Sequence, residues 1–453
     1  MRLDLLTTPL QIFDMNIDTL ISARWVIPVE PEGVVYHRSA IAIQAGTILD
    51  IVPLEEAEVR YHARDIHRLE DQHAVIPGLI NAHTHAAMTL FRGLADDLPL
   101  MDWLNHHIWP AEQRWVTAAF VRDGVQHAIA EMLRGGTTCF NDMYFFPDQT
   151  AEMANQAGIR AMVGLIVIDF PSAWAKDREE YFTKGTEIHQ SFRQHPLIRT
   201  ALAPHAPYSV SAAALERIRD LAEAFDVPIH MHVHETVQEI QQFLADTGVR
   251  PWRHLQRLGL LSPRLQAVHM TQLTEEEIMQ VGEYGIHVIH CPDSNLKLAS
   301  GFCPVPRLAQ AGINIALGTD GAASNNSLDM FQAMRTAALL AKAVAQDACA
   351  IPAASALRMA TLNGARALGL SEHIGSLIPG KAADLIAVDL GGIDSQPLYD
   401  PISQLVYATS RNKISHAWIA GKLVVQNGAL VTLDEAAILA RTEAWRQRIG
   451  SSG

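Results

Sequence analysis

Cationic side chains are scarce in this chain, and long apolar runs are missing. The 453 residues contain 35 Lys and Arg against 49 Asp and Glu, which gives a formal net charge of −14. Nucleic acids and anionic membranes attract basic surfaces, so this balance predicts that neither is a partner. No apolar run is long enough to span a bilayer, and Met1–Met15 lacks the apolar core of a secretory signal. We therefore expect a cytoplasmic protein that begins with a loose leader.

Cysteine is also rare in this chain, and its spacing bears on the redox state of the protein. The four cysteines, Cys139, Cys291, Cys303 and Cys349, are scattered and form no C-x-x-C pair. This pattern predicts reduced thiols and argues against a disulfide framework. The apolar fraction of 49% and the charged fraction of 19% are typical of a globular protein and not of a disordered one. A chain of this length is predicted to form one large domain or two.

Strand-like patterns occur at both ends of the chain. Apolar and β-branched runs, bounded by turn residues such as Ala45-Gly46 and Asn427-Gly428, predict short strands there. The expected strands lie at 19–27, 40–44, 47–52, 384–389 and 417–425. We predict that residues 1–76 and 379–453 pair into one small composite β domain, a β-sandwich, and that a terminal helix follows.

Between these ends, strand patterns alternate with helix patterns, which is typical of a parallel α/β fold. Eight strands are predicted, at 75–82, 137–141, 161–168, 199–203, 228–233, 266–269, 287–290 and 314–318. The helices expected between them include 115–133, 212–224, 274–284 and 328–344. This pattern predicts a (β/α)₈ TIM barrel over residues 77–378, with its active site at the carboxyl ends of the strands.

Residues that can bind a metal follow those strand ends. His83 and His85 lie two residues apart at the end of the first barrel strand, so both rings can face one point. His232 and His269 end the fifth and sixth strands, and Asp320 follows the eighth. Three histidines and one carboxylate can hold a divalent cation and leave a position for water, whose pKa zinc lowers to about 7. We therefore predict a metal site at this face of the barrel.

Some neighbouring residues have a simpler explanation than metal binding. We expect His230 to be a core residue and His234 to lie at the rim. His290 could equally be a packed ring at a strand end, and Cys291 is expected to be an inert packed thiol. An aspartate in a Gly-Thr-Asp-Gly turn often bonds its own backbone, so Asp320 alone would not establish a site. The convergence of several strand ends on one face is the stronger observation.

Four motifs together resemble those of the amidohydrolase superfamily. They are Pro77-Gly78-Leu79-Ile80-Asn81-Ala82-His83-Thr84-His85, Met231-His232-Val233-His234-Glu235-Thr236, His290-Cys291-Pro292-Asp293-Ser294-Asn295-Leu296-Lys297-Leu298 and Gly318-Thr319-Asp320-Gly321. Within this superfamily, the chain resembles the 5'-methylthioadenosine/S-adenosylhomocysteine deaminases over nearly its whole length. The similarity includes Gly380-Lys381-Ala382-Ala383-Asp384-Leu385, which enters the C-terminal part. The resemblance implies a hydrolytic deaminase of adenine nucleosides with one divalent metal ion per subunit, Zn²⁺ in the first place.

The resemblance also implies roles for single residues. The implied metal ligands are His83, His85, His232 and Asp320; the catalytic residues are Glu235, His269 and Asp320; the substrate-binding residues are Glu112, His205, Glu235, Asp320 and Trp115. Glu235 shuttles a proton, His269 orients the attacking water, and Asp320 accepts a proton from that water. Glu112 binds the ribose hydroxyls and His205 contacts the substrate. Trp115, one helical turn after Glu112, is expected either to wall the site or to be a core tryptophan.

Two departures from the family pattern bear on substrate and metal. Leu165 stands where an arginine that contacts the substrate is expected, and a guanidinium would pair with a carboxylate. Its loss favours a short thioether tail, so we expect 5'-methylthioadenosine, and adenosine, to be better substrates than S-adenosylhomocysteine. Two-metal relatives carry a carboxylated lysine on the fourth strand, whereas residues 199–210 contain no lysine. A mononuclear site is therefore expected.

Two other classes of function remain open from the sequence. A related mononuclear enzyme could act on guanine, cytosine or triazine rings, although Glu112 and His205 favour a nucleoside because a free base has no ribose. A non-catalytic barrel that only binds a ligand should lack a metal ligand or the acid, and all these positions carry competent side chains. We expect a small-molecule purine nucleoside as the partner, a role in purine or methionine salvage, and a homo-oligomer, either dimer or tetramer.

Overall fold

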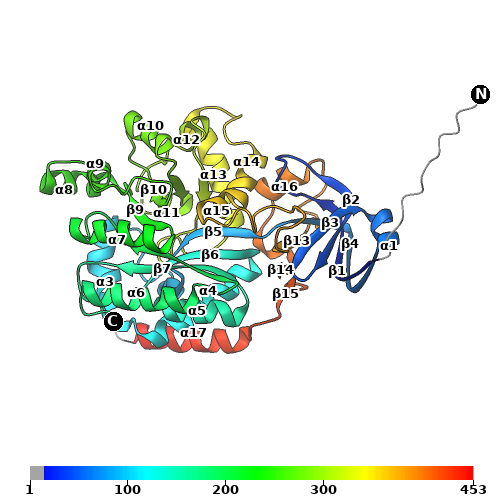
Figure 1. Ribbon diagram of the computed structural model, residues 1–453, viewed down its shortest axis with the longest axis horizontal. Coiled ribbons are helices and arrows are strands. Elements are labelled where there is room, and N and C mark those ends of the chain that lie inside the picture. The colour runs from blue at the N-terminus through cyan, green and yellow to red at the C-terminus, as the bar shows by residue number, and fades with distance from the viewer. Residues whose placement is uncertain (1–14, 452–453) are drawn as a thin grey trace, which may run out of the picture.

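Two sheets organise the chain, and the computed structural model describes residues 15–451, without the side chain of Glu70. One sheet combines strands from both ends of the chain, and the other is the barrel (Figure 1). All but the last residue of the leader predicted at Met1–Met15 lies outside the described residues.

The composite sheet has eight strands in the order β16-β15-β14-β13-β4-β1-β2-β3. Strand β13 pairs antiparallel with β4, so the C-terminal strands continue the N-terminal sheet and the predicted pairing of the two ends is confirmed. The strands are β1 (Met15–Val26), β2 (Tyr36–Gln44), β3 (Thr47–Pro53), β4 (Tyr61–Pro77), β13 (Leu385–Asp389), β14 (Ile414–Ile419), β15 (Lys422–Gln426) and β16 (Ala429–Leu430).

This sheet curls until its two halves meet over a shared apolar interior. The Ala383 amide donates to the Gly46 carbonyl at 2.9 Å, which joins the turn after β2 to the segment before β13. A Cβ atom at Gly46 would lie 2.5 Å from the carbonyl oxygen of Ala420, so only glycine fits this close approach. Ile43 and Trp418 are buried between the halves. The domain thus encloses a core as a sandwich does, although one continuous sheet builds it.

Two predicted strands differ from the observed ones at glycine. The strand predicted at 75–82 is two strands, because Gly78 separates β4 from β5. A Cβ atom at Gly78 would lie only 2.0 Å from the Thr138 hydroxyl oxygen, which shows how closely the chain passes β6 there. The strand predicted at 417–425 is likewise divided between β14 and β15 by a turn at Gly421.

The barrel consists of eight parallel strands in sequential order, as predicted. Its strands are β5 (Leu79–Thr84), β6 (Thr137–Tyr144), β7 (Arg160–Val167), β8 (Ile198–Pro204), β9 (Ile229–Val233), β10 (Leu265–His269), β11 (His287–His290) and β12 (Ile315–Leu317). At the seam between β5 and β12, the Asp320 amide donates to the His83 carbonyl at 3.0 Å. The Asn81 side chain also holds Thr319 across the seam, with contacts of 2.7 and 3.0 Å.

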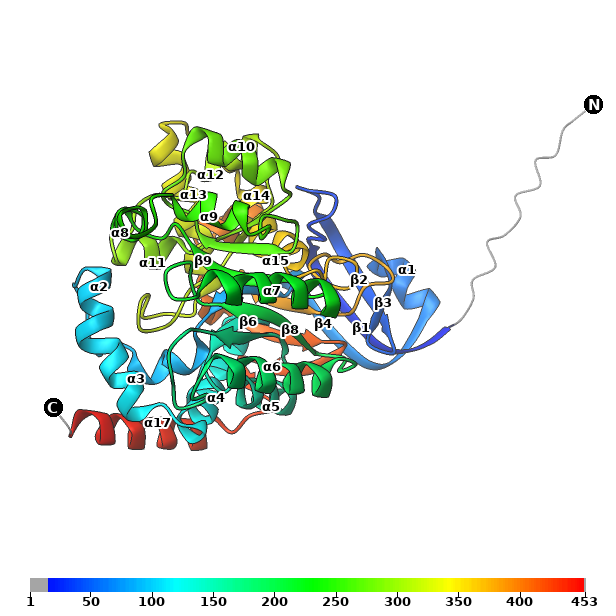
Figure 2. The same ribbon diagram turned by 60° about the vertical axis from the view of Figure 1, so that its left-hand side comes forward.

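The helices mostly surround the barrel and cover its carboxyl end, whereas the first one, at Leu54–Arg60, packs on the composite sheet (Figures 1 and 2). They are α1 (Leu54–Arg60), η1 (Ala86–Phe91), α2 (Leu100–Trp103), the π-helical η2 (Leu104–Ile108), α3 (Trp109–Trp115), α4 (Ala118–Arg134), α5 (Pro147–Ala157), α6 (Arg178–Phe192), α7 (Ala212–Phe225), α8 (Val237–Thr247), α9 (Pro251–Arg257), α10 (Glu275–Glu283), α11 (Pro292–Lys297), α12 (Val305–Gln310), α13 (Met330–Ala345), α14 (Ala353–Met359), α15 (Leu362–Ala367), α16 (Pro401–Tyr407), η3 (Arg411–Lys413) and α17 (Glu435–Gly450). Within residues 15–451, no helix combines the length and the apolar character needed to cross a bilayer.

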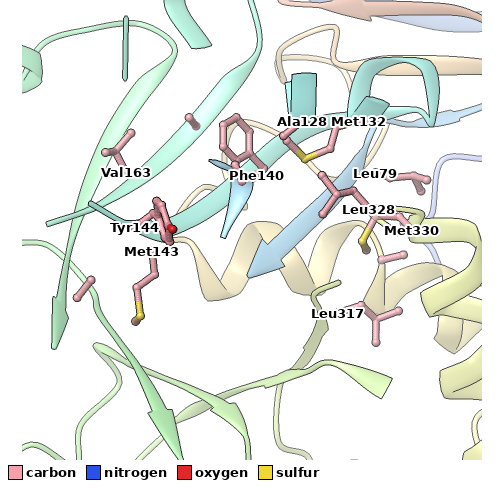
Figure 3. Close-up of a cluster of buried hydrophobic side chains, with 14 of the residues drawn as sticks. Leu79, Ala128, Met132, Phe140, Met143, Tyr144, Val163, Leu317, Leu328 and Met330 are labelled. Carbon is pink, nitrogen blue, oxygen red and sulfur yellow. The ribbon is translucent and has the colours of Figure 1, made fainter. Parts of the chain in front are cut away.

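The main core lies between the barrel strands and these helices. Figure 3 shows part of it, where Phe140 of β6 lies near Ala128 and Met132 of α4, and Val163 of β7 belongs to the same cluster. The four side chains are buried, since at most 1% of each is exposed. Burying such apolar area is the main source of stability, at roughly 25 cal/mol per Å².

The C-terminal segment leaves the composite sheet and returns to the barrel. Helix α17 runs along α4, where the Trp445 indole N–H donates to Asp123 at 3.0 Å and the ring packs on Phe120 (Figure 1). Arg160 of β7 forms a buried ion pair with Asp384, which precedes β13, through contacts of 2.5 and 3.0 Å. The domain boundaries at 76/77 and 378/379 stay a prediction.

Candidate active site

A cavity opens at the carboxyl ends of the barrel strands, beneath α2, η2 and α3. It encloses about 860 Å³ of space open to solvent, which accommodates a nucleoside. The polar residues that line it are His85, Glu112, Tyr144, His205, Tyr208, His232, Glu235, His269, Asp320 and Ser324. The remaining lining residues are apolar, among them Trp103, Ile108, Trp109, Ile166, Ile168 and Phe170. The sequence-predicted site residues therefore meet in one pocket, with the exception of Trp115 and the buried His83.

The four predicted metal ligands converge at the floor of this cavity. His83 Nε2 lies 3.3 Å from Asp320 Oδ1 and 3.2 Å from His232 Nε2, and His85 Nε2 lies 3.2 Å from Asp320 Oδ1. Four ligands at the 2.0–2.1 Å typical of zinc would lie about 3.3 Å apart around a tetrahedral centre. The spacing of these atoms therefore matches the shell of such an ion.

Backbone carbonyls hold two of these imidazoles by their other nitrogen. His85 Nδ1 lies 2.6 Å from the Met143 carbonyl oxygen, and His232 Nδ1 lies 2.9 Å from that of His205. A carbonyl only accepts hydrogen bonds, so each Nδ1 carries a proton and each Nε2 is the nitrogen that can bind a metal. Burial lowers the pKa of His83 to about 4, so this ring is a neutral imidazole. Burial also opposes the charged form of His85, but Asp320 outweighs it and raises the pKa of His85 to about 9. A metal ion would therefore displace a proton from Nε2 of His85, and the converging ligand atoms then fit a cation between them.

Asp320 is fixed by three donors and by its backbone. Its Oδ2 accepts from Ser294 at 2.6 Å and from Ser324 at 2.8 Å, and its Oδ1 accepts from the Gly321 amide at 2.7 Å. Burial opposes the ionised form, but the neighbouring imidazoles of His83 and His85 outweigh it and hold the pKa of Asp320 well below its usual value. Its φ of 64° lies in the left-handed region, a strained conformation that is found at functional sites.

Glu235 and His269 form an acid–imidazole pair beside the cluster. His269 Nε2 lies 3.8 Å from Glu235 Oε2, and its Nδ1 lies 2.8 Å from Asn295 Oδ1. The amide oxygen accepts, so Nδ1 of His269 carries the proton and Nε2 faces the cavity as an acceptor. Burial raises the pKa of Glu235, although His269 opposes the shift. A carboxyl group with a raised pKa is suited to exchange protons near neutral pH.

Glu239, which was not identified from the sequence, supports this pair. Its Oε2 accepts from the Glu235 amide at 2.7 Å, and burial together with the charge of Glu235 raises the pKa of Glu239 to about 7. The side chain belongs to the first turn of α8, which Thr236 caps through the Glu239 amide at 3.1 Å. The signal was present, because Thr-x-x-Glu is a helix start in which the glutamate reaches back to the preceding backbone.

On the far wall, Glu112 of α3 meets Tyr144 at the end of β6. The phenol donates to Glu112 Oε1 at 2.7 Å, and burial raises the pKa of Glu112 to about 7 despite this hydrogen bond. His205 lies beside His232, with ring centroids 5.1 Å apart, and burial lowers its pKa to about 4. The cavity wall thus holds a carboxyl group with a raised pKa and a neutral imidazole. Tyr144 was not identified from the sequence, because a tyrosine at a strand end carries no motif.

Three expectations about neighbouring residues are wrong. Trp115 does not line the cavity, because it ends α3 and its ring faces Arg448 of α17, whose guanidinium carbon lies 5.9 Å from the ring centroid. Leu165 points away from the cavity toward Gly185 of α6, whereas the next residue, Ile166, faces inward. His234 is fully buried under α9 and does not lie at the rim.

The other expectations for this region agree with the structure. His230 is a fully buried core residue, and Cys291 is buried against Gly318. All four cysteines are unpaired. His290 is buried as a packed ring.

Comparisons with known proteins agree with this geometry. A model of the amidohydrolase family matches residues 74–424. A protein of Teredinibacter turnerae named 5-methylthioadenosine/S-adenosylhomocysteine deaminase is 48% identical over 96% of this chain and 98% of its own length. A protein of Saccharophagus degradans with the same name is 48% identical over 95% and 97%.

Two solved structures share this fold and contain bound zinc. An adenosine deaminase from Xanthomonas campestris with bound zinc aligns at a TM-score of 0.96 and 52% identity, over 97% of this chain and 100% of that one. A zinc-bound atrazine chlorohydrolase from Arthrobacter aurescens aligns at 0.88 over 94% and 100%, but at 24% identity it supports the fold alone. The chain belongs to the amidohydrolase family and, within it, to the 5-methylthioadenosine/S-adenosylhomocysteine deaminases.

Proposed function

We propose that this protein is a zinc-dependent hydrolytic deaminase that converts 5'-methylthioadenosine, and also adenosine, to the inosine analogue and ammonia. The observation that carries the proposal is the convergence of three imidazoles and Asp320 next to the Glu235–His269 pair, at the floor of a nucleoside-sized cavity. The names of the relatives and the zinc in the Xanthomonas campestris structure support the same reaction and the same ion.

One Zn²⁺ per subunit would be held by His83, His85, His232 and Asp320. The donor set suits zinc because neutral imidazoles and a carboxylate are among its usual ligands, and iron, cobalt and manganese accept the same set. When bound, the ion supplies Lewis acidity, which makes water a nucleophile at neutral pH. The missing lysine at 199–210 favours a single ion.

The side chains around this ion divide the proton transfers between them. Glu235 takes one proton from the attacking water and delivers it to N1 of the adenine ring, which makes C6 open to attack. Asp320 accepts the second proton, which leaves with the amino group as ammonia. His269, held by Asn295, accepts a hydrogen bond from the water and aims it at C6. The two protons of water thus end on N1 and on ammonia, and its oxygen ends on C6.

The rest of the cavity would hold the sugar and its 5' substituent. The Glu112 carboxylate can accept hydrogen bonds from both hydroxyls of a ribose cis-diol, and His205 presents its Nε2 to the substrate. Of the residues between 15 and 451 that line the cavity, none is lysine or arginine. A zwitterionic amino-acid tail would find no cationic partner there, whereas a methylthio group suits apolar walls. We therefore still expect 5'-methylthioadenosine to be a better substrate than S-adenosylhomocysteine. The reason is the uncharged lining of the cavity and not the identity of Leu165.

Steady-state kinetics on zinc-loaded protein test this function. We expect kcat/KM for 5'-methylthioadenosine to exceed that for S-adenosylhomocysteine by about tenfold or more, because one charge-assisted hydrogen bond contributes roughly 1.5–3 kcal/mol. Comparable values would contradict the preference, and no release of ammonia from any of the three adenine nucleosides would contradict the function.

Glu235→Gln tests the acid. We expect kcat to fall by roughly 10²–10⁴-fold, the usual contribution of a general acid–base, while zinc stoichiometry by elemental analysis stays at one. Glu216→Gln, on the exposed face of α7, is the matched control and should leave both unchanged. An active Glu235→Gln variant would exclude the proposed proton shuttle.

We also propose that the protein is cytoplasmic and forms a homo-oligomer, a dimer or a tetramer. The general prevalence of symmetric oligomers supports this proposal. Light scattering coupled to size exclusion would contradict it if the mass matched one chain of 49.8 kDa.

A further inference from the structure

A continuous line of hydrogen-bonding groups runs from the floor of the metal cluster to the opposite end of the barrel. His83 Nδ1 lies 2.7 Å from His230 Nε2, and His230 Nδ1 lies 2.9 Å from Gln266 Oε1. Gln266 Nε2 then donates to the carbonyl oxygen of Ala367 at 2.7 Å. The three side chains come from β5, β9 and β10 and are fully buried. Ala367 is the last residue of α15, where helix carbonyls lack partners within the helix.

The direction of every hydrogen bond in this line follows from its far end. A backbone carbonyl can only accept, so the amide nitrogen of Gln266 must face Ala367 and its oxygen must face His230. That oxygen can only accept, so His230 carries its proton on Nδ1. A neutral imidazole has one protonated nitrogen, so His230 Nε2 accepts from His83 Nδ1. His83 Nε2 is therefore left with its lone pair directed at His85, His232 and Asp320.

A neighbouring amide lies against this line. Asn141 Nδ2 lies 2.9 Å from Gln266 Oε1 and 3.1 Å from His230 Nδ1. With His230 Nδ1 protonated, the Asn141 amide donates to Gln266 Oε1, which then receives two donors, one for each lone pair. The reverse direction would place a lone pair of His230 Nδ1 against Gln266 Oε1 at 2.9 Å. It would also protonate His83 on Nε2, and a protonated nitrogen cannot bind a metal.

We propose that Gln266 and His230 are positioning residues for the metal site, and that together they lock His83 in the tautomer that can bind zinc. The other two histidine ligands reach the same tautomer through direct contacts with backbone carbonyls. His83 Nδ1 instead meets His230, and the backbone carbonyl that sets its tautomer, that of Ala367, is reached through two relay side chains. Partners of this kind typically change metal affinity by 10–100-fold. This inference rests on the zinc site of the proposed function and deepens it.

Zinc affinity measured by competition with a chromophoric chelator tests the relay without recourse to activity. Gln266→Met keeps the length of the side chain and removes its acceptor, so His230 can adopt either tautomer. We expect the dissociation constant for zinc to rise by about 10–100-fold. Gln272→Met, at a half-buried glutamine that bonds Ser300 and takes no part in the relay, is the matched control and should bind zinc as the wild type does. Wild-type affinity in Gln266→Met would overturn the inference.

Neutron diffraction of the deuterated wild type gives a second readout that needs no variant. We expect deuterium on Nδ1 of both His83 and His230 and none on Nε2 of either. Deuterium on His230 Nε2 would overturn the proposal even if Gln266→Met failed to fold. Failure of the proposed function has a different signature, since wild-type protein would then not bind zinc at all.

Discussion

Tyr144→Phe isolates the hydrogen bond that keeps Glu112 ionised. The Tyr144 phenol donates to Glu112 Oε1 at 2.7 Å, and burial nevertheless raises the pKa of Glu112 to about 7. Only the carboxylate form accepts hydrogen bonds from both hydroxyls of the ribose, so kcat/KM should rise with pH as Glu112 loses its proton. The substitution removes the donor and keeps the ring, so the shape of the wall is preserved.

The size of the effect follows from that single contact. A hydrogen bond to a charged group contributes roughly 1.5–3 kcal/mol, which corresponds to about 1–2 pKa units. Glu112 is half ionised at pH 7 in the wild type, since its pKa is about 7. In the variant its pKa should be about 8–9, so roughly 1–10% is ionised at pH 7. We therefore expect kcat/KM at pH 7 to fall by roughly 5–50-fold and to recover above pH 9.

The assay is the pH profile of kcat/KM for 5'-methylthioadenosine, compared with 2',3'-dideoxyadenosine, which has no diol to bind. The acidic limb for the ribonucleoside should move upward in Tyr144→Phe, whereas wild type and variant should act equally on the dideoxy compound. An unmoved limb would refute the argument that Tyr144 controls Glu112. An equal loss on both substrates would show that the phenol acts on something other than ribose binding.

Two further substitutions test the fold and the specificity. Arg160→Ala should lower the free energy of unfolding by roughly 3–5 kcal/mol in chemical denaturation, because it leaves the buried Asp384 carboxylate without a partner. The control Arg199→Ala, at an exposed arginine, should change the free energy of unfolding little. Equal stability of the two variants would contradict the ion-pair argument. Phe170→Arg places a cation at the mouth of the cavity, where Phe170 is 46% exposed, and should raise kcat/KM for S-adenosylhomocysteine relative to 5'-methylthioadenosine by about tenfold. Met279→Arg on α10 is its control, and an unchanged ratio in Phe170→Arg would argue against the role assigned to the uncharged wall.

Much of the architecture was predictable because strand and helix patterns alternate regularly between residues 79 and 317. Apolar runs that end in polar residues located every barrel strand to within a few residues. Strand β4 was missed because its first part, Tyr61–Gln72, is rich in charged residues and histidine and shows no apolar alternation. It is held by parallel pairing with β1, which is a long-range contact that no local pattern reveals.

The site was predictable where one residue type in one position determines the chemistry, and unpredictable where orientation matters. The metal ligands could be predicted because histidines stand at the strand ends. Which residues of β7 face the cavity depends instead on the register of the strand, and a shift of one residue places Ile166 there in place of Leu165. Supporting side chains such as Asn295 and Gln266 come from other strands and helices, so their contacts appear only after folding.

The seam of the barrel has a consequence for how the protein acquires activity. Asn81 and Thr319, whose hydrogen bond joins the first barrel strand to the last, are 238 residues apart in the sequence. Two of the proposed metal ligands follow them closely along the chain. A ribosome-bound chain that has not yet emerged past β12 possesses the histidines but lacks Asp320. The complete ligand set exists only once the ring is closed, so we expect full-affinity zinc uptake during refolding to follow closure of the barrel.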